Sequence, residues 1–349
     1  MTSDVLIIGG GIIGMTIARR LADDAAGRIT VADRDLAGLG ASARSAGLHF
    51  PSGRTPLVRE MTRFSQAHYL ARMGSFARMR WLPMRVHMAQ EAVVRIAPTF
   101  IPEAALNERA DPGPLVAARP GLTSWDASGA HHTDVCGYVT HLAEGLQGRV
   151  ARLDGSPVTA IAETPGEVEV AFADGAVRRA DWVILAPGPW FGAAPFQPFT
   201  RRLGLRVKRI VAFHIDSPPS DADAAEYFVE DDAFLLPLPW ARRWIFSYTC
   251  DEWDMTPEEA GSGLRAHHRT AAAAILGRYV PGWADRLAGG RVFCDAYSTD
   301  RVPVIRPVTA SGRIVFAGGA NGAGYRLAPA IADRVADLIA NPISQEDVA

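Results

Sequence analysis

The feature that most constrains the fold is an apolar run that ends in a cluster of glycines near the start of the chain. Residues 4–14 read Asp-Val-Leu-Ile-Ile-Gly-Gly-Gly-Ile-Ile-Gly, and an amphipathic stretch follows. This order predicts a buried parallel strand, a tight turn and a helix. Gly9, Gly11 and Gly14 stand at the G-x-G-x-x-G spacing. Gly9 permits the sharp turn, Gly11 lets a pyrophosphate approach the backbone, and Gly14 lets the helix pack closely on the strand.

A second apolar run, residues 28–33, supplies the next strand and ends in an acid, Asp33. A carboxylate at that place can accept hydrogen bonds from the hydroxyls of an adenosine ribose. The free N–H groups and the partial positive charge at the N-terminus of the predicted helix favour a phosphate. The strand, turn, helix and acid together predict a dinucleotide site, which the glycine spacing alone would not.

Composition and charge exclude several classes of protein. The 349 residues carry a formal net charge of −2 and no long basic run, so the basic stripe of a nucleic-acid-binding protein is missing. The cysteines have no C-x-x-C spacing, and the adjacent histidine pairs at 131–132 and 267–268 do not suit a metal. No run reaches the ~18 apolar residues of a membrane span, and the apolar start lacks a basic region before it. We therefore predict a cytoplasmic protein that uses no metal.

The remaining pattern alternates between nucleotide-type elements and β-rich segments. Helices are expected at 55–71 and 135–146, separated by a proline-interrupted region in which residues 115–118 resemble a strand. Period-two alternation predicts an antiparallel meander at 156–178 and further strands between 206 and 249, and a short apolar run predicts a buried strand at 182–186. The C-terminal part predicts a long helix at 256–279, a strand at 312–317, a glycine loop at 318–324 and a helix at 328–339.

Five stretches in order along nearly the whole chain carry a resemblance to a known family. They are residues 9–14 with Asp33-Arg34, 42–46, 181–190, 203–209, and 300–305 leading to 322–330. Together they resemble the flavoprotein family of D-amino-acid, glycine and sarcosine oxidases, and are most similar to bacterial D-arginine-type amino acid dehydrogenases. The resemblance implies non-covalently bound FAD and an α/β fold, in which an antiparallel β-sheet substrate domain is inserted into a Rossmann-type, glutathione-reductase-like FAD-binding domain. We expect residues 1–80, 134–204 and 291–349 in the FAD-binding domain, and 81–133 and 205–290 in the substrate-binding domain.

FAD carries a pyrophosphate, a ribitol chain and an isoalloxazine ring, so it needs more than one loop. The 42–47 loop offers hydroxyls, backbone N–H groups and Arg44 near the phosphates. The 318–327 loop would lie against the ring, where a helix N-terminus stabilises the anionic reduced flavin. The cofactor residues that the resemblance implies are Gly9, Gly11, Ile12, Ile13, Gly14, Asp33, Arg34, Ser42, Arg44, Ser45, Ala46, Gly47, Val158, Ala186, Gly188, Trp190, Gly322, Ala323, Gly324, Tyr325, Arg326 and Leu327.

The resemblance also implies the reaction. In this family a hydride passes from the substrate Cα to flavin N5, and the resulting imine hydrolyses to a carbonyl compound and ammonia or an amine. The expected partner is therefore a small amine or amino acid, with the electron acceptor, or a partner subunit that supplies it, left open. Two alternatives remain: an FAD-dependent 2-hydroxy-acid dehydrogenase with His49 as its base, and a catalytically silent flavoprotein subunit.

Substrate recognition is where the sequence departs from the family pattern. Relatives place an arginine shortly before the acid that corresponds to Asp300, and it clamps the substrate carboxylate. Here Asp295 stands at that position. Either Asp295 faces a cationic or amine group of the substrate, or the alignment is off by one or two residues and Asp295 only ties down a loop. Because an acid cannot clamp a carboxylate, recognition of an ordinary α-amino acid is in question.

The other candidate catalytic residues each have a plainer interpretation. Arg209 is a candidate anion partner or a solvated residue at a strand end, and His49 would lie over the flavin or act as a surface or capping residue. Tyr297 and Asn321 are candidates for the pocket lining. Cys294 is one residue from the position of the covalent-flavin cysteine of sarcosine oxidases, which leaves covalent attachment as the less favoured alternative.

Overall fold

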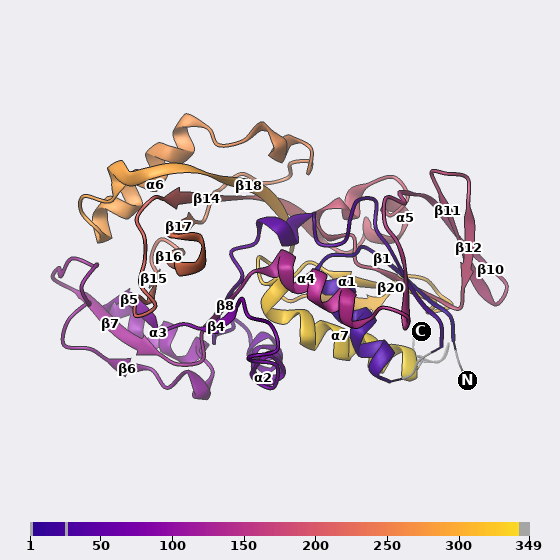
Figure 1. The fold of residues 1–349 in the computed structure, drawn as a ribbon, viewed down its shortest axis with the longest axis horizontal. Coiled ribbons are helices and arrows are strands. Elements are labelled where there is room, and N and C mark those ends of the chain that lie inside the picture. The colour runs from indigo at the N-terminus through magenta and orange to yellow at the C-terminus, as the bar shows by residue number, and fades with distance from the viewer. Residues whose placement is uncertain (1–2, 25–26, 342–349) are drawn as a thin grey trace.

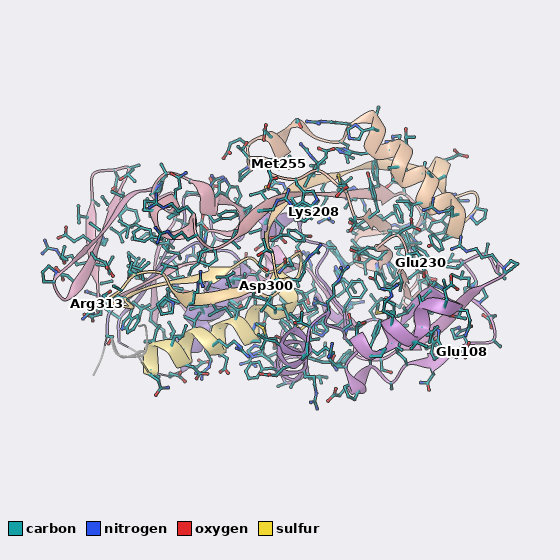
Figure 2. The ribbon with its side chains drawn as sticks, turned by 180° about the vertical axis from the view of Figure 1, so that it is seen from behind. Glu108, Lys208, Glu230, Met255, Asp300 and Arg313 are labelled. Atoms are coloured by element: carbon teal, nitrogen blue, oxygen red, sulfur yellow. The ribbon has the colours of Figure 1, made fainter. Side chains whose placement is uncertain are left out.

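The chain forms two large sheets that lie side by side (Figure 1). The structure is a computed structural model that describes residues 3–24 and 27–341. The N-terminal strands and the C-terminal helix share one half of the molecule, although they come from opposite ends of the sequence (Figure 1). Figure 2 views the molecule from behind, with Arg313 and Glu108 at opposite ends and Lys208 between them.

The first sheet carries the glycine turn. Its order is β19 (Val304–Pro307), β20 (Ile314–Gly318), β13 (Trp182–Leu185), β1 (Val5–Ile8), β2 (Ile29–Ala32) and β9 (Val150–Leu153). Neighbouring strands are parallel except for β19, which is antiparallel to β20. One face packs on helices α1 (Ile12–Asp23), α4 (Val135–Gly145) and α7 (Gly324–Ala340). The other face packs on the meander β10 (Val158–Thr164), β11 (Glu167–Phe172) and β12 (Val177–Ala180).

Burial on both faces explains why β1 is apolar without alternation. Val5 and Ile7 belong to the core on the helical side, and Leu6 and Ile8 to the core on the meander side. A strand covered on both faces reads as a continuous apolar run because successive side chains point to opposite sides. This is the pattern from which the sequence predicted a buried parallel strand.

The turn after β1 requires two of its glycines for steric reasons. Gly9 has φ +111°, and a Cβ atom there would lie 2.2 Å from the carbonyl oxygen of Ala186. A Cβ atom on Gly14 would lie 1.8 Å from the carbonyl oxygen of Gly9. A side chain on Gly9 would therefore clash with the segment that follows β13, and one on Gly14 would push α1 away from the turn after β1.

The second sheet is mainly antiparallel. Its order is β18 (Leu287–Ser298), β14 (Leu205–Ile215), β17 (Arg243–Tyr248), β16 (Ala233–Leu238), β15 (Ala225–Phe228), β5 (Met84–Ala89), β7 (Leu122–Ala127) and β6 (Asn107–Glu108). The β15–β5 pair is parallel. Helix α6 (Ala266–Tyr279) packs on one face of this sheet. Strand β18 crosses residue 291, which the sequence suggested as a domain boundary, and the domain boundaries themselves stay a prediction.

Smaller elements connect the two sheets. Strands β3 (Leu48–His49), β8 (His131–Thr133) and β4 (Met79–Trp81) form a three-stranded sheet. Helix α2 (Pro56–Leu70) begins after Thr55, whose hydroxyl accepts a hydrogen bond from the N–H of Val58. Two single-turn helices, α3 (Val93–Ile96) and α5 (Gln197–Thr200), complete the set. In the part of the chain that the structure describes, no helix is both long and apolar enough to span a membrane.

Three predictions of local structure are wrong. Residues 115–118 form no strand. The helix expected at 256–279 begins only at Ala266, because Gly263 has φ +75° and the preceding residues form a short 3₁₀ turn, Glu259–Ser262. The helix expected at 328–339 begins at Gly324, one turn earlier, with Pro329 inside it.

Helix α7 tolerates Pro329 because another residue replaces the missing hydrogen bond. Proline has no N–H to donate to the carbonyl oxygen four residues earlier, that of Tyr325. The hydroxyl of Tyr69, a residue of α2 that is 1% exposed, donates to that oxygen at 2.6 Å. The contact therefore joins α2 to the first turn of α7.

Replacing Tyr69 by phenylalanine should lower the free energy of unfolding by about 1–3 kcal/mol, because the Tyr325 carbonyl would be left buried without a donor. Urea unfolding at equilibrium measures the change. Tyr138→Phe is the matched control, since Tyr138 is buried in the same core but its hydroxyl makes no hydrogen bond to any residue that the structure describes. Equal effects of the two substitutions would contradict this account of Pro329.

Candidate active site

A cavity of about 410 Å³ runs from the glycine turn to the face of the second sheet. Its lining comes from both large sheets, from the 40–54 segment and from the first turn of α7. The cavity has two halves, which differ in the chemistry of the residues that line them. We call the part beside the β1–α1 turn the nucleotide half, and the part beside β14 and β18 the substrate half.

The nucleotide half contains most of the residues that the sequence predicted for the cofactor. Every predicted cofactor residue lines the cavity except Gly14, whose place is between α1 and the turn. Ser42, in the 3₁₀ turn η1 (Ala41–Arg44), accepts a hydrogen bond from the N–H of Ile12 at 2.9 Å. This bond joins the serine loop to the N-terminus of α1, so that both can face the same ligand.

Asp33 lies at the end of β2, as the sequence predicted, and lines the cavity. Its two carboxylate oxygens accept hydrogen bonds from the N–H groups of Gly10, at 2.6 Å, and Asp35, at 2.9 Å. Burial raises the pKa of the Asp33 carboxyl, against the effect of these hydrogen bonds. Each oxygen keeps a lone pair that a ribose hydroxyl could use.

An aromatic and a cationic side chain close the far end of the nucleotide half. The guanidinium carbon of Arg34 lies 4.0 Å from the centroid of the Trp190 ring, and both residues line the cavity with Val158. Trp190 belongs to the 3₁₀ turn η5 (Gly188–Gly192) and donates to Glu258 at 3.2 Å. A flat apolar surface next to Asp33 suits an adenine ring.

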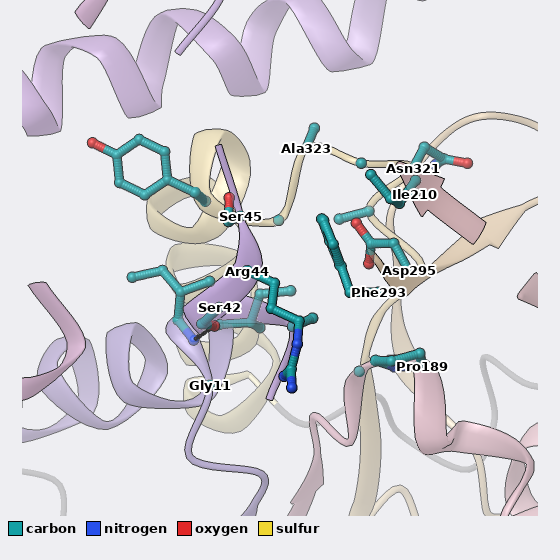
Figure 3. Close-up of a pocket in the computed structure, with 18 of the residues that line it drawn as sticks. Gly11, Ser42, Arg44, Ser45, Pro189, Ile210, Phe293, Asp295, Asn321 and Ala323 are labelled. Atoms are coloured by element: carbon teal, nitrogen blue, oxygen red, sulfur yellow. Dashed lines mark hydrogen bonds between the residues drawn. The ribbon is translucent and has the colours of Figure 1, made fainter. Parts of the chain in front are cut away.

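The substrate half is built from alternate residues of two paired strands. Successive side chains of a strand point to opposite faces, and the ones that line the cavity are Lys208, Ile210 and Ala212 of β14 and Arg291, Phe293, Asp295 and Tyr297 of β18. Figure 3 shows Asp295 beside Phe293, Ile210 and Asn321 on one wall, across from Ser42, Arg44 and Ser45.

Asp295 faces the cavity, which supports the first of the two interpretations of this residue. It pairs with Lys208 across the β14–β18 ladder. One carboxylate oxygen accepts a hydrogen bond from the N–H of Ala296 at 2.9 Å, and no cation of the described residues lies within ion-pair distance of the carboxylate. Burial raises the pKa of Asp295 to about 6.

Lys208 lines the cavity, although the sequence alone did not show on which face of β14 its side chain lies. Its ammonium nitrogen lies 4.8 Å from the ring centroid of Trp253 and 5.5 Å from that of Tyr297. Burial lowers the pKa of Lys208. The cation is therefore held against two aromatic faces rather than paired with Asp295.

Arg326, on the first turn of α7, is a buried cation that lines the cavity. Its Nη1 atom donates to the carbonyl oxygens of Ser52, at 2.8 Å, and Phe50, at 3.4 Å. Within the described ranges no acid forms an ion pair with it. Burial lowers the pKa of Arg326 to about 10, which leaves it charged at neutral pH. Its other donors are available to an anion in the cavity.

Asp232 is the second acid of the substrate half, and its carboxylate already has hydrogen-bond and ion-pair partners. Its carboxylate accepts hydrogen bonds from Thr249, at 2.9 Å, and Tyr227, at 3.1 Å, and pairs with Arg54 at 3.3 Å. Tyr227, Asp232 and Arg54 all line the cavity. The sequence analysis missed this group because its members come from three separate segments.

Tyr297 and Asn321 lie where the sequence predicted them, in the cavity wall. Burial raises the pKa of Tyr297 well above its usual range, and the charge of Asp295 adds to this effect. Asn321 has φ +57° and uses its side chain to hold the end of β18, because its Oδ1 accepts from the N–H of Ser298 at 3.1 Å. Its Nδ2 donates to the carbonyl oxygen of Gly319 at 2.8 Å.

Arg209 and His49 are not brought into the cavity. Arg209 follows Lys208 on β14 and therefore points to the other face, where it is 1% exposed and lies 2.7 Å from Glu252. His49 is fully buried and stacks on His131 at 4.6 Å between ring centroids, while its neighbours Leu48 and Phe50 line the cavity. Neither side chain can touch a ligand in the cavity, so the roles predicted for them are not supported.

The position of Cys294 bears on covalent attachment of a flavin. Cys294 is paired with Arg209 and lies in the core between β18 and the meander, on the face of β18 opposite Asp295. Burial raises the pKa of its thiol to about 12, so it is a poor nucleophile. Both observations favour the prediction of a non-covalent cofactor.

Glu252, which is partly exposed, is the centre of the cluster that holds the buried Arg209. The carboxylate also accepts from His268 at 2.7 Å and His267 at 2.8 Å. Partial burial opposes the effect, but hydrogen bonds from both histidines and the charge of Arg209 lower the pKa of Glu252 to about 2. Cys250, Glu252 and His268 are close enough to hold a metal ion. Arg209 already neutralises the carboxylate, however, and the prediction of no metal stays a prediction.

Replacing Glu252 by glutamine should lower the free energy of unfolding by about 1–3 kcal/mol at neutral pH, because Arg209 would keep its buried charge without a partner. The carboxylate has a lowered pKa, so its contribution is complete above the ordinary value of 4.5 and is lost as pH falls through about 2. Urea unfolding at several pH values measures both effects. His267→Asn, a change at an exposed partner, should cost less than about 0.5 kcal/mol. A variant as stable as the parent at neutral pH would contradict the prediction.

A family model decides the membership of the chain. The model, described as DAO, FAD dependent oxidoreductase, matches residues 4–338. The chain belongs to this family. It is therefore an FAD-dependent oxidoreductase, and its α/β architecture with several sheets is that of the family. A comparison with curated proteins found no match.

Solved structures of several enzymes share the fold. L-proline dehydrogenase from P. horikoshii is 16% identical with a TM-score of 0.82, covering 98% of this chain and 94% of its own. Glycine oxidase from Bacillus cereus ATCC 14579 is 16% identical with a TM-score of 0.79, covering 98% of both chains. Fructosyl amine: oxygen oxidoreductase (Amadoriase I) from Aspergillus fumigatus is 19% identical with a TM-score of 0.76, covering 98% and 88%. At such identities the likeness concerns the fold alone.

The residues present fit FAD. In the nucleotide half, a ligand can come close to the backbone at Gly11, where an added Cβ would meet only the Ser42 hydroxyl, at 3.3 Å. It has a carboxylate with free lone pairs at Asp33 and a flat ring at Trp190. The N-terminus of α7, at Gly324, meets the same cavity and offers positive potential. Sequence reasoning found this half because its signals are local glycine and acid patterns.

Proposed function

We propose that this enzyme oxidises the C–N bond of an amino acid or a related amine in the substrate half of the cavity. The observation that carries the proposal is that a cation, Arg326, and an acid, Asp295, line one cavity together with the predicted cofactor residues, and neither has an ion-pair partner among the described residues. A zwitterion or an amine is the kind of ligand that these two charges recognise. The named substrates of the fold neighbours, proline, glycine and a fructosyl amine, are consistent with this class.

Arg326 is the residue proposed to bind the anionic group of the substrate. Two backbone carbonyls fix one end of its guanidinium, so little side-chain entropy is lost when an anion binds. Its donors in a rigid fork match the two oxygens of a carboxylate. Arg326 would thus take the part that relatives give to an arginine at the position of Asp295.

When bound, FAD supplies the electron acceptor that takes a hydride from the carbon next to nitrogen. The protein orients that carbon and keeps water away from it. Ile210 and Phe293 form the apolar part of the wall between Lys208 and Arg291. The resulting imine hydrolyses to a carbonyl compound and ammonia or an amine.

The residue that would serve as the base in the 2-hydroxy-acid alternative does not line the cavity. Oxidation of an alcohol carbon needs a base close to its hydroxyl, and His49 was the candidate. His49 is fully buried outside the cavity, and burial keeps its pKa well below the usual range. A silent flavoprotein subunit remains the second candidate, because the family arginine is replaced by Asp295.

Anaerobic reduction of the purified holoenzyme tests the proposal. A panel of D- and L-amino acids, N-alkyl amino acids, cyclic amines and 2-hydroxy acids is added, and loss of the visible flavin band is followed. Reduction by an amino acid or amine is the expected result. Reduction by 2-hydroxy acids alone would refute the proposal, and a flavin that no compound reduces would favour the silent subunit. Readmission of air then separates an oxidase from a dehydrogenase.

A further inference from the structure

We propose that Asp295 binds the ammonium group of the substrate and accepts one of its protons. The inference rests on the proposed function and assigns to that site the group that converts the protonated amine into its reactive form. It also sets a substrate class: compounds with a basic amine that can approach the wall formed by β14 and β18.

The Asp295 carboxylate lies in a largely apolar part of the wall and interacts with backbone N–H groups alone among the described residues. The N–H of Ala296 donates to Oδ1 at 2.9 Å, the backbone N–H of Gly322 also interacts with the carboxylate, and no described side chain donates a hydrogen bond to it. Ile210 and Phe293 form the next rung of the same ladder (Figure 3). A carboxylate placed there without a counter-ion is costly, and a bound cation would remove that cost.

The charged and titratable groups around Asp295 are engaged elsewhere. Lys208, from β14, keeps its ammonium group against two aromatic rings, and Tyr297 is neutral. Arg44, from η1, donates to the carbonyl oxygen of Leu39 at 3.3 Å. Arg301 lies with its guanidinium carbon 6.0 Å from the Tyr297 ring. None of these cations forms an ion pair with Asp295.

The other acids of the cavity are not available to an amine in the substrate half. Asp33 and Asp35 belong to the nucleotide half, where the N–H of Gly10 and that of Asp35 itself bind the Asp33 carboxylate. Asp232 is tied to Arg54, Tyr227 and Thr249. In the substrate half, Asp295 is therefore the acid that no side-chain donor and no cation of the described residues engages.

The proton transfer balances without another reactant. An N–H bond of the substrate ammonium breaks and leaves its electron pair on nitrogen, and an O–H bond forms on the Asp295 carboxylate. The products are a neutral amine and a neutral carboxyl group. The lone pair on nitrogen then supports loss of a hydride from the neighbouring carbon. Burial, which raises the pKa of Asp295 to about 6, makes it a better acceptor than an ordinary aspartate.

The pH dependence follows from this role. Below about pH 6 the carboxyl of Asp295 already carries a proton and cannot accept another. The rate of flavin reduction in the wild-type holoenzyme should therefore fall with decreasing pH through that region, approaching ~tenfold per pH unit. Flavin reduction in Asp295→Asn should be slower and should not fall further at acidic pH. Asp295→Glu should restore part of the rate and the decrease at acidic pH.

Binding provides a readout that does not depend on turnover. tert-Butylammonium carries no hydrogen on the carbon next to nitrogen and cannot be oxidised, and pivalate is its anionic counterpart of the same shape. Each probe is titrated into the oxidised holoenzyme while the flavin spectrum is recorded. Asp295→Asn should weaken tert-butylammonium at least tenfold and leave pivalate unchanged or tighter. Glu144→Gln, at an exposed acid of α4, is the charge-matched control and should change neither.

The outcomes are separable. Equal binding of tert-butylammonium by the wild type and Asp295→Asn, or a decrease in rate at acidic pH that persists in this variant, would overturn the inference alone. A wild-type enzyme that no amine or amino acid reduces would overturn the proposed function and the inference together. The flavin band and thermal unfolding are measured for each variant to show whether that variant is folded. If Asp295→Asn does not fold, Asp295→Glu still provides a decisive test.

Discussion

Replacing Gly14 by alanine is expected to remove bound FAD and to lower the stability of the protein. The added Cβ would lie 1.8 Å from the carbonyl oxygen of Gly9 and 3.4 Å from a methyl group of Ile7. The first contact involves backbone on both sides, so α1 must move away from β1. Overpacking of this kind costs about 1–3 kcal/mol or more, and the movement also displaces the N–H groups that face the pyrophosphate.

The matched control is Gly277→Ala, which makes the same substitution in another helix. A Cβ on Gly277 of α6 would meet nothing closer than Ala284, at 3.9 Å. The control should keep its FAD and gain about 0.5–1 kcal/mol, because alanine is the better helix former. Flavin absorbance per protein and urea unfolding report both quantities. A Gly14→Ala protein that retains a full complement of FAD would contradict the account of this turn.

Replacing Arg326 by methionine should weaken binding of substrates that carry a carboxylate by about 10- to 100-fold. Charge-assisted hydrogen bonds from a buried arginine contribute about 1.5–3 kcal/mol, and 1.4 kcal/mol corresponds to a factor of ten. The effect should fall on the half-saturation concentration in anaerobic flavin reduction, with a smaller effect on the limiting rate. Methionine keeps most of the side-chain volume beside Tyr325 and Leu327 and cannot bind an anion.

Two comparisons separate this role from a structural one. Arg326→Lys keeps the positive charge but lacks the paired N–H donors of the guanidinium group. It should recover part of the affinity for carboxylate substrates. Oxidation of a carboxylate-free amine by Arg326→Met should show the half-saturation concentration of the parent. If both classes of compound lost affinity equally, Arg326 would be a structural residue, held by Ser52 and Phe50, and the proposed anion site would be wrong.

The sequence predicted most of the nucleotide half because its determinants are local. The turn at Gly9 and the acid at Asp33 each follow from a few consecutive residues, and the structure places both in the cavity wall. The antiparallel strands between 206 and 249 followed from their period-two alternation. Helix boundaries were harder to predict, since the N-terminal turn of α7 includes Gly324 and contains Pro329 only because Tyr69 supplies a donor from α2.

The substrate half could be predicted only in part, because it depends on which face of a strand meets the cavity. Lys208 and Arg209 are adjacent and both basic, and nothing local tells which one points inward. The ladder between β14 and β18 decides it, since Lys208 pairs with Asp295 and Arg209 with Cys294. Knowing that Asp295 faces the cavity would have excluded Arg209.

The most direct test of the central claim is the identity of the nitrogen product in a single turnover. Holoenzyme is reduced under anaerobic conditions by the compound of the panel that acts fastest, and the released carbonyl compound and ammonia or amine are counted per FAD. The account predicts one carbonyl and one nitrogen product for each FAD reduced. Reduction without release of a nitrogen compound, or a protein purified without flavin that binds none when FAD is added, would contradict it.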